Sequence, residues 1–240
     1  MQNAKPVTIL NVKFCFGETE DAIHPVVLQD GVHTILIDCG YTGFLPAIET
    51  AMQEDGISCK DLTHVLITHH DHDHMGALSA LKKKYPHIQV VAGEYEEPYI
   101  SGRLKSMRLA QAEAMQLSLP EDQQAFGIAF CNILKNVEPV PVDRIVHGGD
   151  VLDWVGGCTV LDTPGHTPGH ISLYLNDENI MIAGDAAVVE NEKLEIANPQ
   201  FTLDMQAAAK SLKQLLKYGA AEVICYHGGI YLPKDINNAN

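Results

Sequence analysis

Short runs of apolar residues, each ended by glycine, proline or a polar turn, divide most of the chain into strand-sized and helix-sized pieces. Runs of aliphatic and β-branched residues indicate strands, whereas apolar residues spaced three and four apart indicate helices. Asp30-Gly31 lies between two such runs and is a hairpin signal. The predicted strands are 7–14, 26–29, 34–37, 64–68, 89–92, 144–146, 158–162, 171–175, 180–183 and 222–226, and the predicted helices are 44–55, 76–84 and 202–218.

The order of these elements predicts the fold class. Strands followed by strands, and then helices alternating with strands, occur twice along the chain. Because each sheet must bury a face, two such halves are expected to pack sheet against sheet with helices outside. This order favours an α/β (α+β) fold built as a four-layer αββα sandwich. No internal repeat, low-complexity tract or Ser/Gly linker interrupts the pattern, so we expect residues 1–240 to form a single domain.

The segment from about residue 94 to 138 interrupts the alternation. Its first part has apolar residues at spacings of three and four, which predicts an amphipathic helix, and Pro120 separates it from a second apolar segment. We expect a helical insertion packed on the core. An inserted element of this kind can also form a lid or wall of a substrate pocket. The spaced residues are Leu104, Met107, Ala110, Ala114 and Leu117.

Composition narrows the choice of partners and compartment. The chain has 16 basic and 31 acidic residues, a poor match for the phosphate backbone of nucleic acid. The apolar stretch 7–16 contains a lysine and an asparagine and reads as a strand, and no run reaches the roughly 18 apolar residues of a membrane span. Six cysteines without a CxxC pair are typical of reduced thiols. We therefore expect a cytoplasmic protein without nucleic-acid or membrane partners, and its oligomeric state stays open.

The richest chemistry lies in THHDHDHMG, residues 68–76, which holds four histidines and two aspartates directly after a predicted strand. Imidazole and carboxylate groups together suit zinc, iron or manganese. Further histidines and an aspartate follow three other predicted strands, each next to glycine. Strand ends are where proteins with alternating strands and helices build their sites, so this pattern predicts a metal site. The distant residues are His166 and His170 in DTPGHTPGH, Asp185 in IAGDA and His227 in CYHGG.

In this order the motifs resemble those of the metallo-β-lactamase superfamily, which has a HxHxDH motif followed by distant His, Asp and His ligands. The resemblance runs from LIDCG at 36–40 to His227, and only the 94–138 insertion is peculiar to this chain. GHTPGH is most similar to the glyoxalase II and lactonase side of the superfamily. The resemblance implies an αββα metallo-hydrolase.

The resemblance also implies a ligand set. In the superfamily the Asp-His pair is followed by one residue and a glycine, which here identifies Asp73 and His74. Counting back, His69 is the first histidine and Asp71 stands where the second histidine is usual, so this chain reads HxDxDH. The rival frame, with His70, His72 and His74 alternating on one side of an extended segment, stays open.

In the superfamily frame, two groups of three ligands each hold one divalent ion. The resemblance assigns His69, Asp71 and His166 to the first ion, Asp73, His74 and His227 to the second, and Asp185 to a bridge between them. Asp38 and His170 are expected behind the ligands, where they would steady them. Zinc is the first expectation for both ions, and manganese or iron are the alternatives, since Asp71 makes the first group harder.

These assignments imply a dinuclear hydrolase in which metal-bound hydroxide attacks the carbonyl of a small ester, thioester or lactone, with Asp73 orienting the proton. Two other functions remain. One is a non-haem iron persulfide dioxygenase, because two histidines and an aspartate with open positions resemble the iron triad of oxygenases. The other is a non-catalytic ligand-binding protein on the same fold. The sequence leaves the substrate open.

Overall fold

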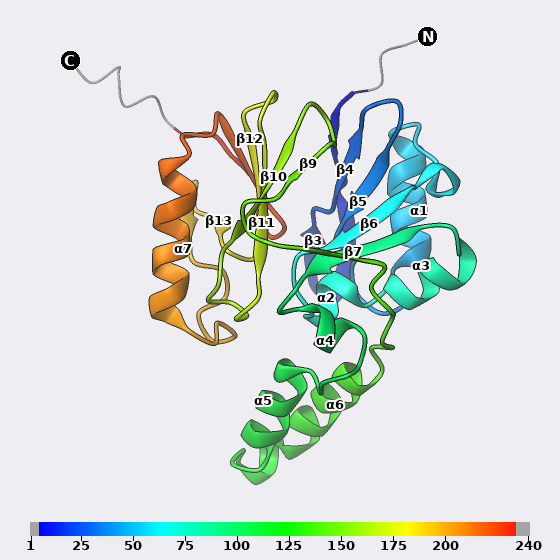
Figure 1. Cartoon of the computed structure of the whole chain (residues 1–240). Helices are drawn as coiled ribbons and strands as arrows, with labels where there is room; N and C mark the ends of the chain where they lie inside the picture. Colours follow the sequence, from blue (N-terminus) through cyan, green and yellow to red (C-terminus); the bar gives the residue numbers. More distant parts are fainter. Residues whose placement is uncertain (1–4, 234–240) are drawn as a thin grey trace, which may run out of the picture.

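Two six-stranded mixed sheets face each other in the computed structural model, which describes residues 5–233 (Figure 1). The first sheet has the order β1 (Val7–Ile9), β4 (Val26–Gln29), β5 (Thr34–Ile37), β6 (His64–Ile67), β7 (Gln89–Gly93) and β8 (Arg144–Val146). The second has the order β16 (Gly229–Tyr231), β15 (Glu222–Cys225), β12 (Ile180–Gly184), β11 (Ile171–Leu175), β10 (Cys158–Asp162) and β9 (Val151–Leu152).

Helices cover the outer face of each sheet. Figure 1 shows α1 (Leu45–Glu54) and α3 (Leu78–Lys84) on the first sheet and α7 (Met205–Lys217) on the second. Shorter elements complete the described chain: hairpins β2 (Val12–Phe16) with β3 (Thr19–Ile23) and β13 (Val188–Glu190) with β14 (Lys193–Glu195), and helical turns η1 (Cys59–Asp61) and α2 (His72–Met75). The expected four-layer αββα sandwich is confirmed.

Side-chain alternation along the strands explains the layers. In β5, Ile35 and Ile37 point into the core between the sheets, whereas Leu36 points outward to α1 and α3. A strand buried on both faces reads as an uninterrupted apolar run, which is why these strands are easy to predict. Leu173 and Ile182 face Ile35 and Ile37 from the second sheet in the same cluster. The core between the sheets therefore fixes how the two halves meet.

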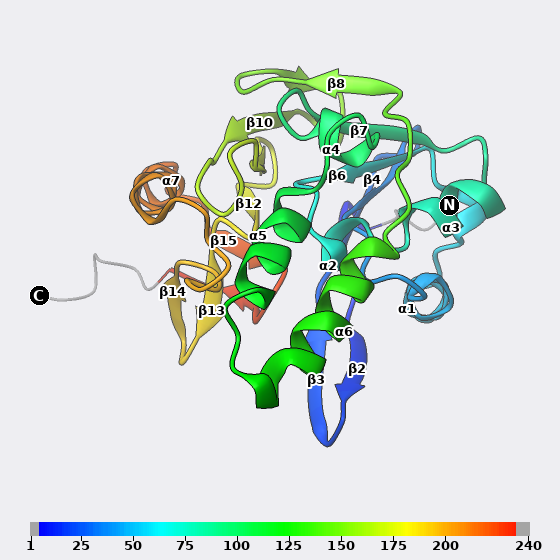
Figure 2. The same ribbon diagram turned by 90° about the horizontal axis from the view of Figure 1, so that it is seen from below.

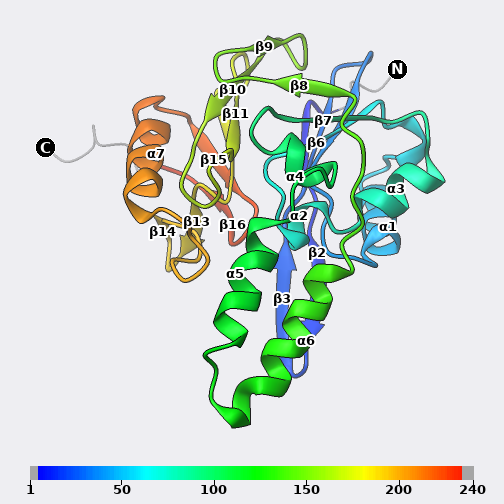
Figure 3. The same ribbon diagram turned by 60° about the horizontal axis from the view of Figure 1, so that its bottom comes forward.

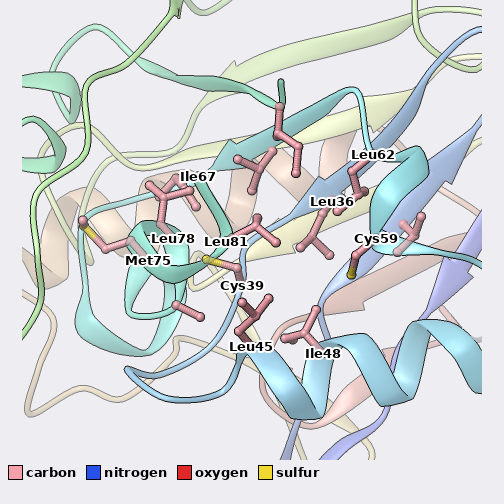
Figure 4. Packing of buried hydrophobic residues seen from close by; sticks show 14 of the residues in the cluster. Leu36, Cys39, Leu45, Ile48, Cys59, Leu62, Ile67, Met75, Leu78 and Leu81 are labelled. Atoms are coloured by element: carbon pink, nitrogen blue, oxygen red, sulfur yellow. The ribbon is translucent and has the colours of Figure 1, made fainter. Parts of the chain in front are cut away.

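The outer core of the first half is also close-packed (Figure 4). Ile48 of α1 and Leu78 and Leu81 of α3 are almost completely buried and pack against the outward side of the first sheet. Cys39 and Cys59 lie in the same cluster, and burial raises the pKa of the Cys59 thiol to about 12. These two cysteines therefore pack as small apolar side chains.

The insertion begins beside the sandwich and continues as a helical hairpin of two helices that projects from one edge of it, seen from below in Figure 2 and with the bottom of the molecule brought forward in Figure 3. It comprises α4 (Glu97–Ile100), α5 (Met107–Gln116), η2 (Glu121–Gln123) and α6 (Gln124–Lys135). The prediction that regularly spaced apolar residues form the buried face of its first long helix is wrong. Leu104 precedes the helix and is 52% exposed, and Leu117 is 83% exposed, whereas the residues that α5 buries are Arg108 and Ala112. A polar contact, not apolar periodicity, sets the orientation of α5.

The other boundaries differ less from the prediction. The predicted strand 7–14 is divided into β1 and β2, and the helix 202–218 begins at Met205, where the Asp204 side chain accepts hydrogen bonds from the backbone of Gln206 and Ala207. Between residues 5 and 233, every helix is too short or too polar to span a bilayer.

Asp30 connects the β4–β5 turn to the second half of the molecule. Its Oδ1 accepts hydrogen bonds from the backbone of Val32 (2.9 Å) and His33 (2.7 Å), and its Oδ2 accepts one from the backbone of Val155 (3.1 Å). Partial burial alone would raise the pKa of Asp30, but the hydrogen bonds from His33, Val32 and Val155 lower it to about 2. The ionised carboxylate is therefore the form that stabilises the fold.

We expect Asp30→Ala to lower the free energy of unfolding by about 1–2 kcal/mol at pH 7, because several hydrogen bonds to one carboxylate are lost. Since the folded-state pKa lies below the usual value, the stabilisation is complete above about pH 4 and disappears as the pH falls toward 2. Urea unfolding of wild type and variant across this range tests the expectation, with the exposed Asp122→Ala as control. A wild-type advantage that stays constant down to pH 2 would contradict it.

Candidate metal centre

Strand ends from both sheets meet at the edge of the sandwich that carries α2 and, beyond it, the α5–α6 hairpin (Figure 1). Asp38 follows β5, and the 69–74 run follows β6 in the first sheet. His166, Asp185 and His227 follow β10, β12 and β15 in the second sheet. The site is thus divided between the two halves, and the core between the sheets holds its parts together.

A first group of possible ligands contains His69, Asp71 and His166, all of them buried. Nε2 of His166 lies 3.0 Å from Oδ2 of Asp71, and Nε2 of His69 lies 3.7 Å from the same oxygen. Burial alone would raise the pKa of Asp71, but His166, His69 and the Arg108 guanidinium hold it well below its usual range. The carboxylate is therefore an anion among imidazoles.

A second group contains Asp73, His74 and His227. Nε2 of His227 lies 3.2 Å from Oδ2 of Asp73, and Nε2 of His74 lies 3.9 Å from it. Burial alone would raise the pKa of the Asp73 carboxyl group, but the surrounding His74, His227 and His72 side chains lower it. Tyr226 stabilises this group from behind: its hydroxyl donates to the Asp73 carbonyl oxygen (2.6 Å), and its ring packs on His74 with centroids 3.9 Å apart.

Asp185 lies between the two groups. Its Oδ2 is 3.5 Å from Nε2 of His166 in the first group, and its Oδ1 is 3.3 Å from Nε2 of His74 and 3.7 Å from Nε2 of His227 in the second. Burial alone would raise the pKa of Asp185, but these histidines hold it well below its usual range. One carboxylate therefore presents an oxygen to each group.

These side chains fit divalent metal ions. Within residues 5–233, Nε2 of His69 and His74 and Oδ1 of Asp71 and Asp185 are buried and have no hydrogen-bond partner. Buried polar atoms without partners are rare and costly unless something else satisfies them. Neutral imidazole nitrogen and carboxylate oxygen are the donor atoms that zinc, manganese and iron take. The donor set and its unsatisfied atoms thus both match a metal centre.

Asp38 and His170 orient the candidate ligands. Asp38 accepts hydrogen bonds from the backbone and hydroxyl of Thr68 at Oδ1 (2.9 Å) and Oδ2 (2.8 Å), and its Oδ2 lies 2.9 Å from Nδ1 of His74. This contact leaves Nε2 of His74 directed at the site. His170 accepts the backbone N–H of Asp185 at Nε2 (2.9 Å), so Nδ1 is its donor to Thr163 (2.8 Å). Burial, together with neighbouring His69 and His166, keeps the pKa of His170 well below its usual value.

Two glycines, Gly76 and Gly184, allow the backbone to lie in close contact with neighbouring segments of the site. A Cβ at Gly76 would lie 2.3 Å from both the His72 carbonyl oxygen and the Thr42 backbone nitrogen. A Cβ at Gly184, which has φ +56°, would lie 2.8 Å from Nε2 of His170, the atom that positions Asp185. Any larger residue at either position would displace the loops that carry the site.

His70 and His72 lie outside both of these groups and outside a third group of possible ligands in the described chain, His69, His74 and Asp185. His70 is buried, with Nδ1 hydrogen bonded to Glu96 and Nε2 accepting the backbone N–H of Met107 (3.3 Å). Both of its nitrogens are therefore engaged. The His72 ring packs edge-on against Tyr41 and Phe130. The frame with His69, Asp71, Asp73 and His74 is the one whose side chains converge.

The sequence analysis did not identify Glu96, which connects the loop that contains His69–His74 to the loop that contains His166–His170. Its Oε2 accepts the backbone N–H of His70 (2.9 Å), and its Oε1 accepts the Thr167 hydroxyl (2.7 Å) and the Gly169 backbone (3.0 Å). Burial alone would raise the pKa of Glu96, but His70, His69 and Thr167 lower it. The available signal was its position just after a buried strand, where the other acidic site residues also lie.

Arg108 was missed as well. Its Nη2 and Nε donate to Oδ2 of Asp71 at 2.6 and 3.1 Å, and the side chain is buried. The signal was a single basic residue in an otherwise uncharged or acidic stretch, MRLAQAEAMQ, together with an aspartate in place of the usual histidine. The insertion therefore contributes a charged side chain to the site.

Comparison with known proteins identifies the family. The family model of the metallo-beta-lactamase superfamily matches residues 19–227. The chain belongs to this superfamily. Its members share the fold described above, and the protein is a metallo-hydrolase of the metallo-β-lactamase superfamily.

Individual relatives are distant. A probable metallo-hydrolase, YflN of Bacillus subtilis, is 28% identical over 205 residues, which are 81% of this chain and 75% of that protein. A hydroxyacylglutathione hydrolase of Nitrobacter winogradskyi is 30% identical over 158 residues, 63% of this chain but only 46% of the relative. The metallo-beta-lactamase family protein TTHA1429 of Thermus thermophilus has a similar fold, with a TM-score of 0.71 and 23% identity, over 95% of this chain and 75% of the other.

Glu96 generates a test of the connection between the loops. We expect Glu96→Gln to lower the free energy of unfolding by roughly 2–4 kcal/mol, because the amide group cannot accept from His70, Thr167 and Gly169 together and leaves buried donors unpaired. Denaturant unfolding of the metal-free protein measures the effect. Glu94→Gln, at an exposed carboxylate two residues away, is the control. Equal stability of the two variants would refute the idea that Glu96 stabilises the fold by connecting the two loops.

Proposed function

We propose that this metallo-hydrolase is dinuclear and attacks the carbonyl carbon of a small ester, thioester or lactone. The observation that carries the proposal is the position of Asp185, whose two oxygens face different groups of candidate ligands. A carboxylate in this position is suited to bridge two cations. In this proposal His69, Asp71 and His166 hold one ion, and Asp73, His74 and His227 hold the other.

Divalent ions at such a site, zinc foremost, supply a water molecule of lowered pKa and polarise the carbonyl oxygen of a substrate. The chain's own residues supply orientation and proton handling. Asp73 is the most accessible of the three carboxylates, with 13% of its side chain exposed against 5% for Asp71 and 3% for Asp185. Its Oδ2 faces His227 at the open side of the site, so Asp73 is the carboxylate suited to accept and orient a proton.

The surroundings support a small, partly apolar substrate. A cavity of about 290 Å³ lies between α5, α6 and Phe201, with Arg108 on its wall and Phe130 and Met115 among its apolar lining. The Nitrobacter relative is named for hydrolysing an acylglutathione, and thioesters are therefore one of the substrate classes to be tested. Lactones and simple esters present the same reacting carbonyl.

Metal content and turnover test the proposal together. We expect purified protein to bind close to two equivalents of zinc, manganese or iron, and we expect chelation to abolish hydrolysis of at least one ester, thioester or lactone. Elemental analysis and a substrate panel measure both. One iron per chain with oxygen consumption on a persulfide would instead establish a dioxygenase, and metal binding without any turnover would leave a ligand-binding protein.

Substitutions at neighbouring positions test the ligand assignment. Asp71→Ala removes a proposed ligand and should reduce the metal content toward one equivalent with nearly complete loss of hydrolysis. His72→Ala, one residue away, should keep both ions and most activity. Asp71→His should keep both ions, with selectivity shifted toward zinc. If His72→Ala loses an ion while Asp71→Ala keeps two, the frame with alternating histidines is correct.

The insertion is expected to contact the non-reacting part of the substrate. Phe130 lines the cavity and lies 5.8 Å from the His72 ring between centroids. Phe130→Ala should raise KM for the substrate with the largest apolar group by about 5- to 30-fold, the effect of losing roughly 1–2 kcal/mol of apolar contact. Metal content should not change. Ile128→Ala, at a half-exposed residue of the same helix that does not line this cavity, should behave as wild type.

A further inference from the structure

Arg108 reaches from the insertion into the first ligand group. It is the second residue of α5, and its side chain is 3% exposed. Nη2 lies 2.6 Å from Oδ2 of Asp71 and 3.3 Å from Nε2 of His166, and Nε lies 3.1 Å from the same Asp71 oxygen. The guanidinium thus contacts two of the three side chains in this group.

Further contacts within the insertion and with Phe201 hold the arginine in this position. Nη1 donates to the Gln111 side chain at 2.5 Å, and the guanidinium lies over the Phe201 ring, 5.2 Å from its centroid. The helix that carries it is fixed at its first turn, where Ser106 accepts from the Leu109 backbone and the Met107 backbone donates to His70. Because a guanidinium keeps its charge at all ordinary pH values, this is a permanent cation beside Asp71.

The oxygen that Arg108 binds is also the one directed at the histidines. Oδ2 of Asp71 is 3.0 Å from Nε2 of His166 and 3.7 Å from Nε2 of His69, so it is the Asp71 atom best placed to ligate a cation with them. A metal ion and the guanidinium would share one oxygen and repel each other. In contrast, the ion pairs of Asp73 and Asp185 within residues 5–233 involve only histidines.

We propose that Arg108 competes with the metal ion for the first group, so that the two sites load in order, the second group before the first. This inference rests on the two-site arrangement of the proposed function. Arg108 also lines the cavity of about 290 Å³ between α5 and α6, which offers space for its side chain to withdraw while α5 stays folded. Loading of the first site is then an exchange of one cation for another at Asp71.

The test is a zinc titration of metal-stripped, full-length protein against a chromophoric chelator. Wild type should bind in two steps, with the weaker step absent in Asp71→Ala. Arg108→Met, which keeps the length of the side chain but removes its charge, should strengthen the weaker step by on the order of 10-fold and leave the stronger step unchanged. Arg103→Met is the matched control, because Arg103 belongs to the same insertion but is 66% exposed and pairs with Glu97.

Thermal unfolding gives a second readout that does not depend on activity. Without metal, Arg108→Met leaves Asp71 buried without its partner, so its unfolding midpoint should fall by several degrees, and saturating zinc should abolish the difference from wild type. In an Asp71→His background the guanidinium has no carboxylate to hold it beside the first group, so adding Arg108→Met should raise the zinc affinity of the first site far less than it does in wild type. If Arg108→Met folds poorly, Arg108→Gln keeps a hydrogen-bond donor near Asp71 without the charge and should likewise strengthen the weaker zinc-binding step.

Several outcomes would overturn the inference: equal affinities at both sites in wild type, weaker zinc binding by Arg108→Met, or one equivalent bound in wild type and Arg108→Met alike. A support role for Arg108, in which it orients Asp71 as a ligand, predicts the second of these. Two ordered binding steps without hydrolysis of any substrate would leave the inference intact and refute the proposed hydrolase activity alone.

Discussion

The burial of several carboxylates side by side is the constraint on which the rest of this structure depends. Asp38, Asp71 and Asp185 are almost completely buried, Asp73 has 13% of its side chain exposed, and all four lie at one edge of the sandwich. Anions in such a place are destabilising unless charges and hydrogen bonds compensate them. The compensation here comes from histidines on both halves, from Thr68 for Asp38, and from one arginine for Asp71. Loss of one partner leaves an anion buried without compensation, so the site tolerates few substitutions.

A site whose residues come from two different sheets needs a precise relative position of the two sheets. Neither group of candidate ligands comes from a single loop. In the second group, Asp73 comes from the first half and His227 from the second, yet their side chains lie 3.2 Å apart. Their relative position depends on apolar side chains between the sheets, such as Ile37 and Ile182, which lie in one buried cluster. Packing in the core therefore fixes the positions of side chains at the edge, and changes in core volume far from the candidate metal centre are expected to disturb the geometry of the candidate ligands.

Much of this arrangement was predictable from the sequence, but not all of it. β5 is a run buried on both faces and was located correctly, as was β10. His166 and Asp185 come shortly after strands, and the topology of the sheet brings them to one edge. Glu96 and Arg108 were not predictable in the same way. Each acts through one long side chain on partners that include residues 26 or more positions away, and neither local periodicity nor strand order encodes such contacts.

The wrongly predicted buried face of α5 and the aspartate at position 71, where the superfamily usually has histidine, have the same physical origin. A helix normally turns its apolar face inward, but α5 turns Arg108 inward and leaves Leu117 in solvent. An aspartate in place of a neutral histidine adds one negative charge to the first group, and a buried arginine restores the charge that a histidine would have given. The aspartate and the arginine are thus two halves of one electrostatic change, contributed by segments far apart in the chain. The α5–α6 hairpin for this reason contributes directly to the candidate metal centre, through Arg108.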